Sequence, residues 1–533
     1  MSDTTTEFDA IVVGAGFSGL YMLYELRRRG LTARVLEAGS DVGGTWYWNR
    51  YPGARCDVES LDYSYSFDED LQQEWKWTER YPAQPEIQRY LAHVADRFDL
   101  RKDITFDTRV VAAHYDPPSA TWTVRTEAGD RLTARYCILA TGCLSVPKAP
   151  EIPGLEDFRG PVYHTATWPE SDVDFSGKRV GVFGTGSSGV QAIPVIAQQA
   201  GHLTVFQRTP AFSVPAFNGP LDPEWEREIK ADYAERRRQN RASEAGLVRG
   251  DNPQSAHDVD DEQRQREYET RYTKGGFGIL GAYADLMADQ RANDTVSDFV
   301  RQKIRERVTD PEVAERLLPW EYPLGTKRIC VDTDYYETFN RDNVTLVDLR
   351  RDTLETVAEN GVRTARGEVE LDCLVLATGF DAMTGAVNRI DIRGRDGAAL
   401  AEKWGAGPRT YLGLATAGFP NLFLLAGPGS PSVLTNMVTA IEQHVEWTGR
   451  CIEHLRTHGY RTIEPTVEAE DGWVDHVNEV ASMTLFPKAA SWYLGANVPG
   501  KPRIFMPYAG GFATYEKQCD EVAEQDYRGF VLK

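Results

Sequence analysis

The residues best placed to do chemistry begin with a glycine turn near the N-terminus. Gly14, Gly16 and Gly19 form a G-x-G-x-x-G pattern after the apolar stretch 8–13. Such glycines permit a tight turn, and the N–H groups at the start of the following helix can hold a pyrophosphate. After the next apolar stretch, Glu37 can accept both hydroxyls of an adenosine ribose. This register predicts a dinucleotide site and disfavours a glycine turn in an unrelated α/β fold.

A second turn repeats the pattern in the middle of the chain. Gly184, Gly186 and Gly189 follow an expected strand at 178–183. At the offset where the first site has Glu37, the second has neutral Gln207 followed by Arg208. Loss of the carboxylate and gain of a guanidinium suit a 2′-phosphate, because arginine offers planar paired donors to phosphate oxygens. The second site is therefore expected to bind NADPH rather than NADH, and two such sites in one chain indicate electron transfer between nucleotide cofactors.

Composition limits what else the protein could be. Its 533 residues exceed one compact core and predict two to four domains. A net charge of -21 disfavours nucleic acid and anionic membranes as partners. No segment reaches the roughly 18 uninterrupted apolar residues of a membrane span, and the polar, acidic start 1–9 is unlike a signal peptide. Seven cysteines, an odd and sparse set, do not indicate a disulfide framework. We expect a cytoplasmic protein without a metal site or an obligate protein partner.

The two turns must be positioned by α/β elements. The predicted fold has two Rossmann-like dinucleotide-binding domains with an inserted helical subdomain. The glycine pair 43–44, soon after the ribose carboxylate, resembles that of flavin-dependent oxidoreductases, which implies FAD in the first domain and NADPH in the second. The A-T-G segments 140–142 and 377–379 are expected where the chain leaves and re-enters the FAD domain. The expected boundaries are 1–143 and 381–533 for the FAD-binding domain, 144–215 and 325–380 for the NADPH-binding domain, and 216–324 for the insertion.

Hydrophobic periodicity places the other elements. We expect strands at 33–36, 104–111, 122–126, 131–140, 202–206, 371–376 and 421–425. Helices are expected at 86–98, 225–241, 260–271, 299–308 and 311–318, with a further one from Asn436 to about Gly459. The glycine-rich patch 275–281 is a candidate for the substrate entrance.

Two longer strings carry a family resemblance. Residues 158–169 read F-x-G-x-x-x-H-x-x-x-W-P, and residues 43–57 read G-G-x-W-x(4)-Y-P-G-x(3)-D. Together they resemble the fingerprints of Baeyer–Villiger monooxygenases, the flavoenzymes that insert oxygen beside a ketone carbonyl. The S-P-S-x-L pattern at 430–434 resembles the phenylacetone and steroid monooxygenase branch and departs from the cyclohexanone type. The resemblance covers essentially the whole chain.

The resemblance implies the chemistry and the catalytic residues. NADPH reduces FAD, O2 gives a C4a-peroxyflavin, and this attacks a ketone to form an ester or lactone through a Criegee intermediate. An aryl, cyclic or steroid-like ketone is expected, and sulfides are possible further substrates. Arg328 would face the flavin and stabilise the anions with a permanent charge, held in place by Asp57. His164 and Trp168 are expected to be structural, Cys56 a filler residue and Trp48 an ordinary core aromatic.

Further site residues are implied by the same resemblance. The flavin residues are Gly14, Gly16, Gly19, Glu37, Gly44, Thr45, Trp46, Asp57, Val58, Tyr63, Val110 and Met437. The NADP residues are Arg55, Gly186, Ser187, Ser188, Gly189, Gln191, Arg208, Thr209, Lys327, Arg328 and Trp492, with Lys327 assisting Arg208 on the 2′-phosphate and Trp492 on a mobile loop. The substrate pocket would be bordered by Ser432, Val433, Leu434 and Met437.

Three alternatives stay open. A flavin monooxygenase of amines or sulfides shares the nucleotide sites but departs from the 158–169 string in its final residues. A pyridine-nucleotide disulfide reductase is disfavoured because Cys137 and Cys143 do not form a C-x-x-C pair. A flavin-bearing binding or scaffold protein that only senses NADPH would not need the pair Lys327-Arg328.

Overall fold

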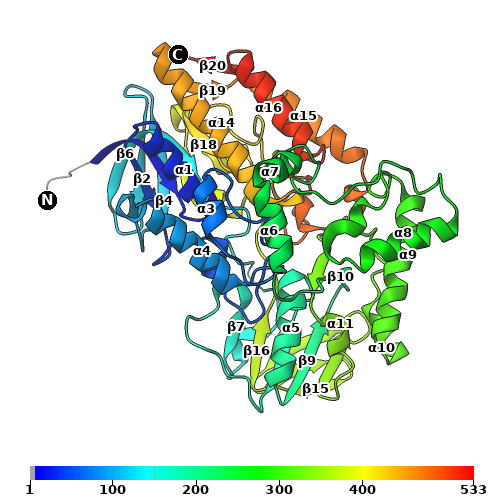
Figure 1. Ribbon diagram of the computed structural model, residues 1–533. Helices are drawn as coiled ribbons and strands as arrows, with labels where there is room; N and C mark the ends of the chain where they lie inside the picture. The colour runs from blue at the N-terminus through cyan, green and yellow to red at the C-terminus, as the bar shows by residue number, and fades with distance from the viewer. Residues whose placement is uncertain (1–5, 149) are drawn as a thin grey trace.

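The computed structural model describes residues 6–148 and 150–533 (Figure 1). From its sequence, the N-terminal stretch 1–9 is unlike a signal peptide. Residues 1–5 of that stretch lie outside the described residues. Two sheets dominate the molecule. In Figure 1 the first sheet, labelled at β2, β4 and β6, lies beside α1 (Phe17–Arg28) and α14 (Met437–His458), while β7, β9 and β16 of the second sheet lie at the opposite end. Within the described ranges, no helix combines the length and apolar character needed to cross a bilayer.

The first sheet contains the first nucleotide turn. Its order is β17-β4-β5-β6-β1-β2-β3, and β18 also pairs with β6. β1 lies parallel to both β2 and β6, whereas β4, β5 and β6 form an antiparallel meander. The strands are β1 (Thr6–Val13), β2 (Ala33–Leu36), β3 (Ile104–Thr105), β4 (Val110–Asp116), β5 (Thr121–Thr126), β6 (Arg131–Leu139), β17 (Asp391–Arg393) and β18 (Leu422–Leu424).

One strand expectation for this sheet is wrong. Instead of a single strand at 104–111, the chain forms β3 and β4 with a break between them. Asp107 in this break has a positive φ of 51°, and its N–H donates to the Gly39 carbonyl oxygen. That left-handed residue cannot continue a regular ladder.

The second sheet contains the second nucleotide turn and is entirely parallel. Its order is β12-β9-β8-β16-β7, with β7 (Val162–His164), β8 (Arg179–Phe183), β9 (His202–Gln207), β12 (Val344–Asp348) and β16 (Cys373–Leu376). The edge strand β7 belongs to the 158–169 string and pairs with β16, which leads into the second A-T-G segment. The string at 158–169 therefore contributes the edge strand β7 to the second sheet.

The segment between β10 (Ser213–Pro215) and β11 (Cys330–Asp332) is largely helical, as expected. Its helices are α6 (Pro223–Ala231), α7 (Tyr233–Arg241), α8 (Asp261–Tyr272), α9 (Gln290–Arg307) and α10 (Pro311–Leu317), with the 3-10 turn η4 (Gly276–Gly281). The single helix expected at 225–241 is two helices, because Asp232 leaves helical geometry and caps α7 by accepting from the Glu235 N–H. The helix expected at 299–308 begins earlier, where Asp289 caps it.

Helix α7 is anchored to the first sheet's part of the molecule. The Arg236 guanidinium pairs with both oxygens of buried Asp62, and the Asn240 amide donates to the same carboxylate. Arg241 pairs with Glu446 of α14 and Glu516 of α16. The insertion therefore contacts both halves of the protein and is not confined to the second sheet.

Helix α14 (Met437–His458) runs along α1 (Phe17–Arg28), and the two share the largest apolar core. It begins near the expected start, where the Asn436 side chain caps it by accepting from the Val438 N–H, and it ends at Gly459, whose φ of 74° suits glycine. The remaining helices are α2 (Thr45–Trp48), α3 (Glu69–Glu74), α4 (Gln84–Arg97), α5 (Ser187–Gln199), α11 (Tyr335–Thr338), α12 (Gly385–Asn388), α13 (Leu400–Lys403), α15 (Val467–Ser482) and α16 (Phe512–Glu524). The remaining strands are β13 (Leu354–Ala358), β14 (Gly361–Thr364), β15 (Gly367–Glu370), β19 (Ile463–Pro465) and β20 (Phe530–Leu532).

Candidate active site

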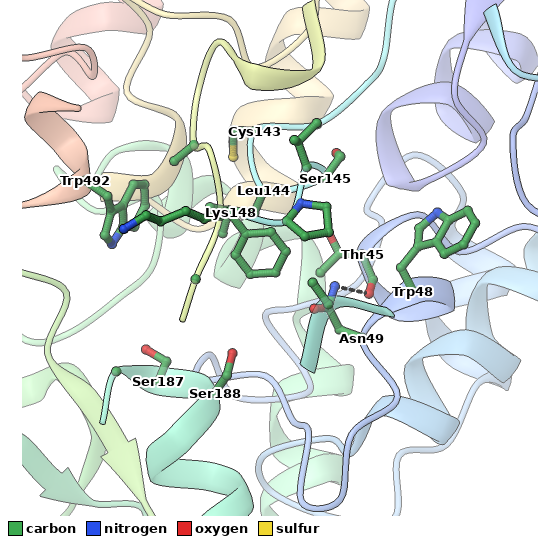
Figure 2. Close-up of a pocket in the computed structure, with 18 of the residues that line it drawn as sticks. Thr45, Trp48, Asn49, Cys143, Leu144, Ser145, Lys148, Ser187, Ser188 and Trp492 are labelled. Carbon is green, nitrogen blue, oxygen red and sulfur yellow. Dashed lines mark hydrogen bonds between the residues drawn. The ribbon is translucent and has the colours of Figure 1, made fainter. Parts of the chain in front are cut away.

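A cavity of about 1320 Å³ lies between the two sheets and reaches both glycine turns. Figure 2 shows part of its lining, with Thr45, Trp48 and Asn49 on one side and Ser187 and Ser188 at the start of α5 on another. One continuous space therefore joins the two expected nucleotide sites. This arrangement suits electron transfer between two bound cofactors.

The first turn is built by close backbone contacts. Gly14 has a φ of 105°, and a Cβ there would lie 2.6 Å from the Ala140 carbonyl oxygen of the first A-T-G segment. A Cβ at Gly19 would overlap the Gly14 carbonyl oxygen, so Gly19 shapes the turn without lining the cavity. Gly16 faces Gly44, and a Cβ at Gly16 would come within 3.3 Å of the Gly44 Cα. The glycine pair 43–44 thus packs against the turn itself.

The second turn repeats this geometry. Gly184 also has a φ of 105°, and a Cβ there would overlap the Ala377 carbonyl oxygen of the second A-T-G segment. A Cβ at Gly189 would overlap the Gly184 carbonyl oxygen. Gly186 lines the cavity and has no atom within 4 Å of its would-be Cβ, so a side chain there would project into space that a ligand can use. This cradle fits a dinucleotide phosphate at the N-terminus of α5.

Glu37 lines the cavity at the end of β2, although it is almost fully buried. Its Oε2 accepts from the Ala15 N–H at 2.6 Å and its Oε1 from the Gly39 N–H at 2.7 Å. Burial raises the pKa of Glu37, while these backbone donors act against the rise. The carboxylate is fixed at the place where the sequence predicts the adenosine ribose.

The other residues assigned to the flavin also reach this cavity: Thr45, Trp46, Asp57, Val58, Tyr63, Val110 and Met437. The Trp46 indole N–H donates to the Tyr63 hydroxyl at 3.1 Å, which fixes both rings at the wall. Trp48, expected in the core, is partly exposed and lines the cavity (Figure 2), so that expectation is wrong. The sequence around Trp48 did not indicate which face of α2 would be exposed to the cavity.

A bidentate ion pair at the cavity joins Arg328 to Asp57. Arg328 Nε donates to Asp57 Oδ2 at 2.8 Å, and Nη2 donates to Oδ1 at 2.6 Å. The remaining Nη1 donates to the Val433 carbonyl oxygen at 2.8 Å. Burial alone would lower the pKa of Arg328, but the Asp57 carboxylate raises it above its ordinary value. The guanidinium is therefore a fixed positive charge at the cavity wall.

Gln191 connects the 43–57 string to α5. Its Oε1 accepts from the Tyr51 hydroxyl at 2.8 Å and from the Arg55 N–H at 3.3 Å, and its Nε2 donates to the Arg55 carbonyl oxygen at 3.0 Å. The Arg55 guanidinium pairs with Glu79 at 2.7 Å. A side chain at Gly53 would overlap the Gln191 carbonyl oxygen. The structure thus brings Arg55 and Gln191 together where the two halves meet.

At the far end of the second site, Arg208, Thr209 and Lys327 line the cavity. Lys327 Nζ lies 4.5 Å from the Tyr322 ring centre, and burial together with nearby Arg208 lowers its pKa while Glu321 raises it. Gln207 does not line this space. It is fully buried, and its amide donates to the Arg316 carbonyl oxygen of α10. Only the arginine of the Gln-Arg pair therefore faces the expected nucleotide.

The substrate-side residues divide into two pairs. Val433 and Met437 line the cavity, whereas Ser432 and Leu434 do not. Ser432 is fully buried with a φ of 44°, and Leu434 packs into a small apolar cluster with Cys143. The 3-10 turn η6 (Ser432–Leu434) therefore presents one of its three side chains to the cavity.

The segment around η8 (Trp492–Leu494) closes another side of the cavity. Ser491, Trp492 and Asn497 line it. Ser491 Oγ and Asn497 Oδ1 are buried and lack a hydrogen-bond partner among the described residues. Such groups require a partner, and a bound dinucleotide with amide and hydroxyl groups can provide one.

Several lining residues were missed by sequence reasoning, among them Asn49, Cys143, Leu144, Ser145 and Lys148 (Figure 2). Four of them directly follow the first A-T-G segment or lie close behind it. Since both sheets place their A-T-G segment against a glycine turn, the chain after Gly142 must pass the cavity. That position in the sequence was an available signal.

The fold and the cavity define a flavoprotein-type oxidoreductase with two dinucleotide sites. The sequence model of the family described as pyridine nucleotide-disulphide oxidoreductase matches residues 11–273. All seven cysteines lie among the described residues, where each is buried and unpaired, and no two of them form the C-x-x-C pair of a disulfide reductase.

Relatives define the family more narrowly. The chain is 44% identical to the acetone monooxygenase (methyl acetate-forming) of a Gordonia species, over 99% of this chain and 100% of that protein. It is 44% identical to a Baeyer–Villiger monooxygenase of Pseudooceanicola batsensis, over 98% and 96%. A solved structure of oxidised steroid monooxygenase bound to NADP is 52% identical, with a TM-score of 0.95 and 99% of both chains covered. The chain belongs to the Baeyer–Villiger monooxygenases, FAD-containing enzymes that use NADPH.

Proposed function

We propose that this chain inserts one oxygen atom beside the carbonyl of a small-molecule ketone, with Arg328 and Asp57 at the reacting centre. The bidentate pair that these residues form at the wall of a cavity shared by both nucleotide turns carries this proposal. Family membership supports it. Bound FAD, reduced by NADPH, supplies the activated oxygen from O2.

The residues of the chain perform the rest. Glu37 holds the adenosine ribose of the flavin nucleotide, and the N-terminus of α5 with Ser187 and Ser188 holds the phosphates of NADPH. Arg328 stabilises the negative charge that develops on the substrate oxygen. It keeps its proton because a guanidinium is charged at its ordinary pKa, which Asp57 raises further. Asp57 orients the guanidinium. The Ser491–Asn497 segment closes over the nicotinamide nucleotide.

The substrate is proposed to be an aryl, cyclic or steroid-like ketone. Cys143, Leu144, Val433 and Met437 give this part of the cavity an apolar wall, which favours a ketone with hydrocarbon bulk. The likeness to a steroid monooxygenase structure supports the larger members of this range. We also propose the domain boundaries given in the sequence analysis. In this proposal helix α7 of the insertion contacts the FAD-binding domain.

The test is NADPH oxidation by the purified holoenzyme with aryl, alicyclic and steroid ketones, with products identified by mass. We expect a ketone-stimulated rate and a product heavier than the substrate by one oxygen atom. Oxidation that no ketone stimulates and that yields only hydrogen peroxide, together with oxygenation of amines or sulfides, would instead assign the chain to the flavin N- or S-monooxygenases.

A further inference from the structure

Three cationic side chains line the cavity: Lys148, Arg208 and Lys327. None of them has a carboxylate at ion-pair distance within residues 6–148 and 150–533. Glu321, which influences Lys327, is bound to Arg350 at 3.0 Å. In a chain with a net charge of -21, a group of cations without acidic partners marks a site for an anion.

Arg208 lies close enough to each of the two lysines to affect its pKa. Burial lowers the pKa of Lys148, the Arg208 guanidinium lowers it further, and Glu151 raises it. Arg208 lowers the pKa of Lys327 as well. Such mutual repulsion disfavours the cluster in the empty protein, and a phosphate with two negative charges would reverse it.

The backbone of Lys148 is fixed relative to the second sheet. Its N–H donates to the Gly379 carbonyl oxygen at 3.0 Å, and Pro147 pairs with Phe380 in an antiparallel bridge. These contacts join the two segments in which the chain passes from one sheet to the other, each following an A-T-G segment, beside the second nucleotide turn. In Figure 2 the Lys148 side chain extends into the open space above Ser187 and Ser188.

We propose that Lys148 is a third cation of the 2′-phosphate site, together with Arg208 and Lys327, and that it contributes to the preference for NADPH over NADH. This inference rests on the proposed assignment of the second turn to NADPH. The pyrophosphate has its own site at the start of α5. Arg208 follows the ribose position, so the cluster lies where a 2′-phosphate would be attached.

The experiment measures ligand binding to the FAD-loaded enzyme by calorimetry, without turnover. The probes are adenosine 2′,5′-bisphosphate, NADP⁺ and NAD⁺, and the variants are Lys148→Gln and Lys148→Arg. Lys517→Gln, on the exposed face of α16, is the matched control. We expect Lys148→Gln to weaken adenosine 2′,5′-bisphosphate and NADP⁺ by about tenfold, or about 1.4 kcal/mol, with NAD⁺ changed less than twofold. Lys148→Arg should retain most of the affinity.

An equal loss for NADP⁺ and NAD⁺ would place Lys148 on the pyrophosphate and overturn the inference, as would unchanged binding of all three probes. If the unsubstituted enzyme itself bound NAD⁺ as tightly as NADP⁺, the NADPH assignment of the second turn would fail instead. The two failures are therefore distinguishable.

Discussion

Both carboxylate oxygens of Asp57 accept hydrogen bonds from the guanidinium of Arg328, at 2.8 Å and 2.6 Å. Asp57 lies in the first sheet's part of the chain, and Arg328 lies in the segment that follows the insertion. The pair therefore forms only when both segments are in place. It brings a fixed positive charge to the cavity wall.

Substitution of Arg328 is expected to abolish most oxygenation. Arg328→Ala should lower the rate of ketone oxygenation by roughly 10²–10³, the usual cost of removing a donor from a developing anion. Arg328→Lys keeps the charge but loses the paired geometry, so we expect partial activity. The measurement is oxygenated product formed per enzyme per minute.

A matched control comes from Arg236, whose guanidinium also pairs with both oxygens of an aspartate, Asp62, outside the cavity. Arg236→Lys should leave the oxygenation rate within about twofold if only the cavity pair takes part in chemistry. Equal losses in Arg236→Lys and Arg328→Lys would mean that the pairs act through folding alone.

Gln191→Leu should loosen the contact between the 43–57 string and α5. The Tyr51 hydroxyl would lose its acceptor while its ring stays buried, which costs about 1–3 kcal/mol of unfolding free energy. Urea denaturation measures this, and NADP⁺ titration should show weaker binding. Gln198→Leu, on an exposed position of the same helix, should change neither. Unaltered stability in Gln191→Leu would show that the contact is dispensable.

Because His444 is buried, we expect the free energy of unfolding to fall in mild acid. Its Nδ1 accepts from the Ala426 N–H at 2.8 Å, and its Nε2 contacts the Tyr515 hydroxyl at 2.9 Å. Burial lowers the pKa of His444 to about 3. The unfolded chain binds a proton near pH 6.5, so stability falls as the pH drops from about 6.5 towards 3, by about 1.4 kcal/mol between pH 7.5 and 5.5.

The check for His444 is urea denaturation at several pH values. His444→Gln should be less stable at neutral pH but should show a smaller decline between pH 7.5 and 5.5. A variant that follows the same slope as the unsubstituted protein would assign the acid sensitivity to other groups.

Lys501 is expected to hold the Trp492 segment closed. Its Nζ donates to Asp381 Oδ1 at 2.6 Å and to the Ala382 carbonyl oxygen at 2.7 Å, next to the second A-T-G segment. Lys501→Met should increase chymotrypsin cleavage at Trp492 or Tyr493 several-fold and weaken NADP⁺ binding. Lys517→Met serves as the control. Cleavage equal in both variants would contradict this role.

The local patterns predicted most of the fold. Both glycine turns and the approximate start and the end of α14 could be derived from short-range rules, because each depends on local backbone geometry. The role of the A-T-G segments came from their resemblance to two-dinucleotide oxidoreductases. The Arg328–Asp57 pair required the family resemblance, since spacing alone would have left Arg328 on the surface.

Local patterns did not determine which side chains face the cavity. The Gln207 amide donates to the Arg316 carbonyl oxygen of α10, a distant segment, and Ser432 is buried within its own turn η6, where its φ is positive. The break at Asp107 depends on a hydrogen bond to Gly39. Lys148 belongs to no recognisable sequence motif. The bridge between Pro147 and Phe380, which only the folded structure shows, places Lys148 near Arg208.

The contact of each A-T-G segment with its own glycine turn has a mechanical consequence. Ala140 lies against Gly14, and Ala377 against Gly184. Any rotation between the two sheets must therefore be taken up by the chain after each alanine. Each half would then carry its own phosphate site as a rigid unit, and the distance between flavin and nicotinamide could change during turnover without release of either pyrophosphate.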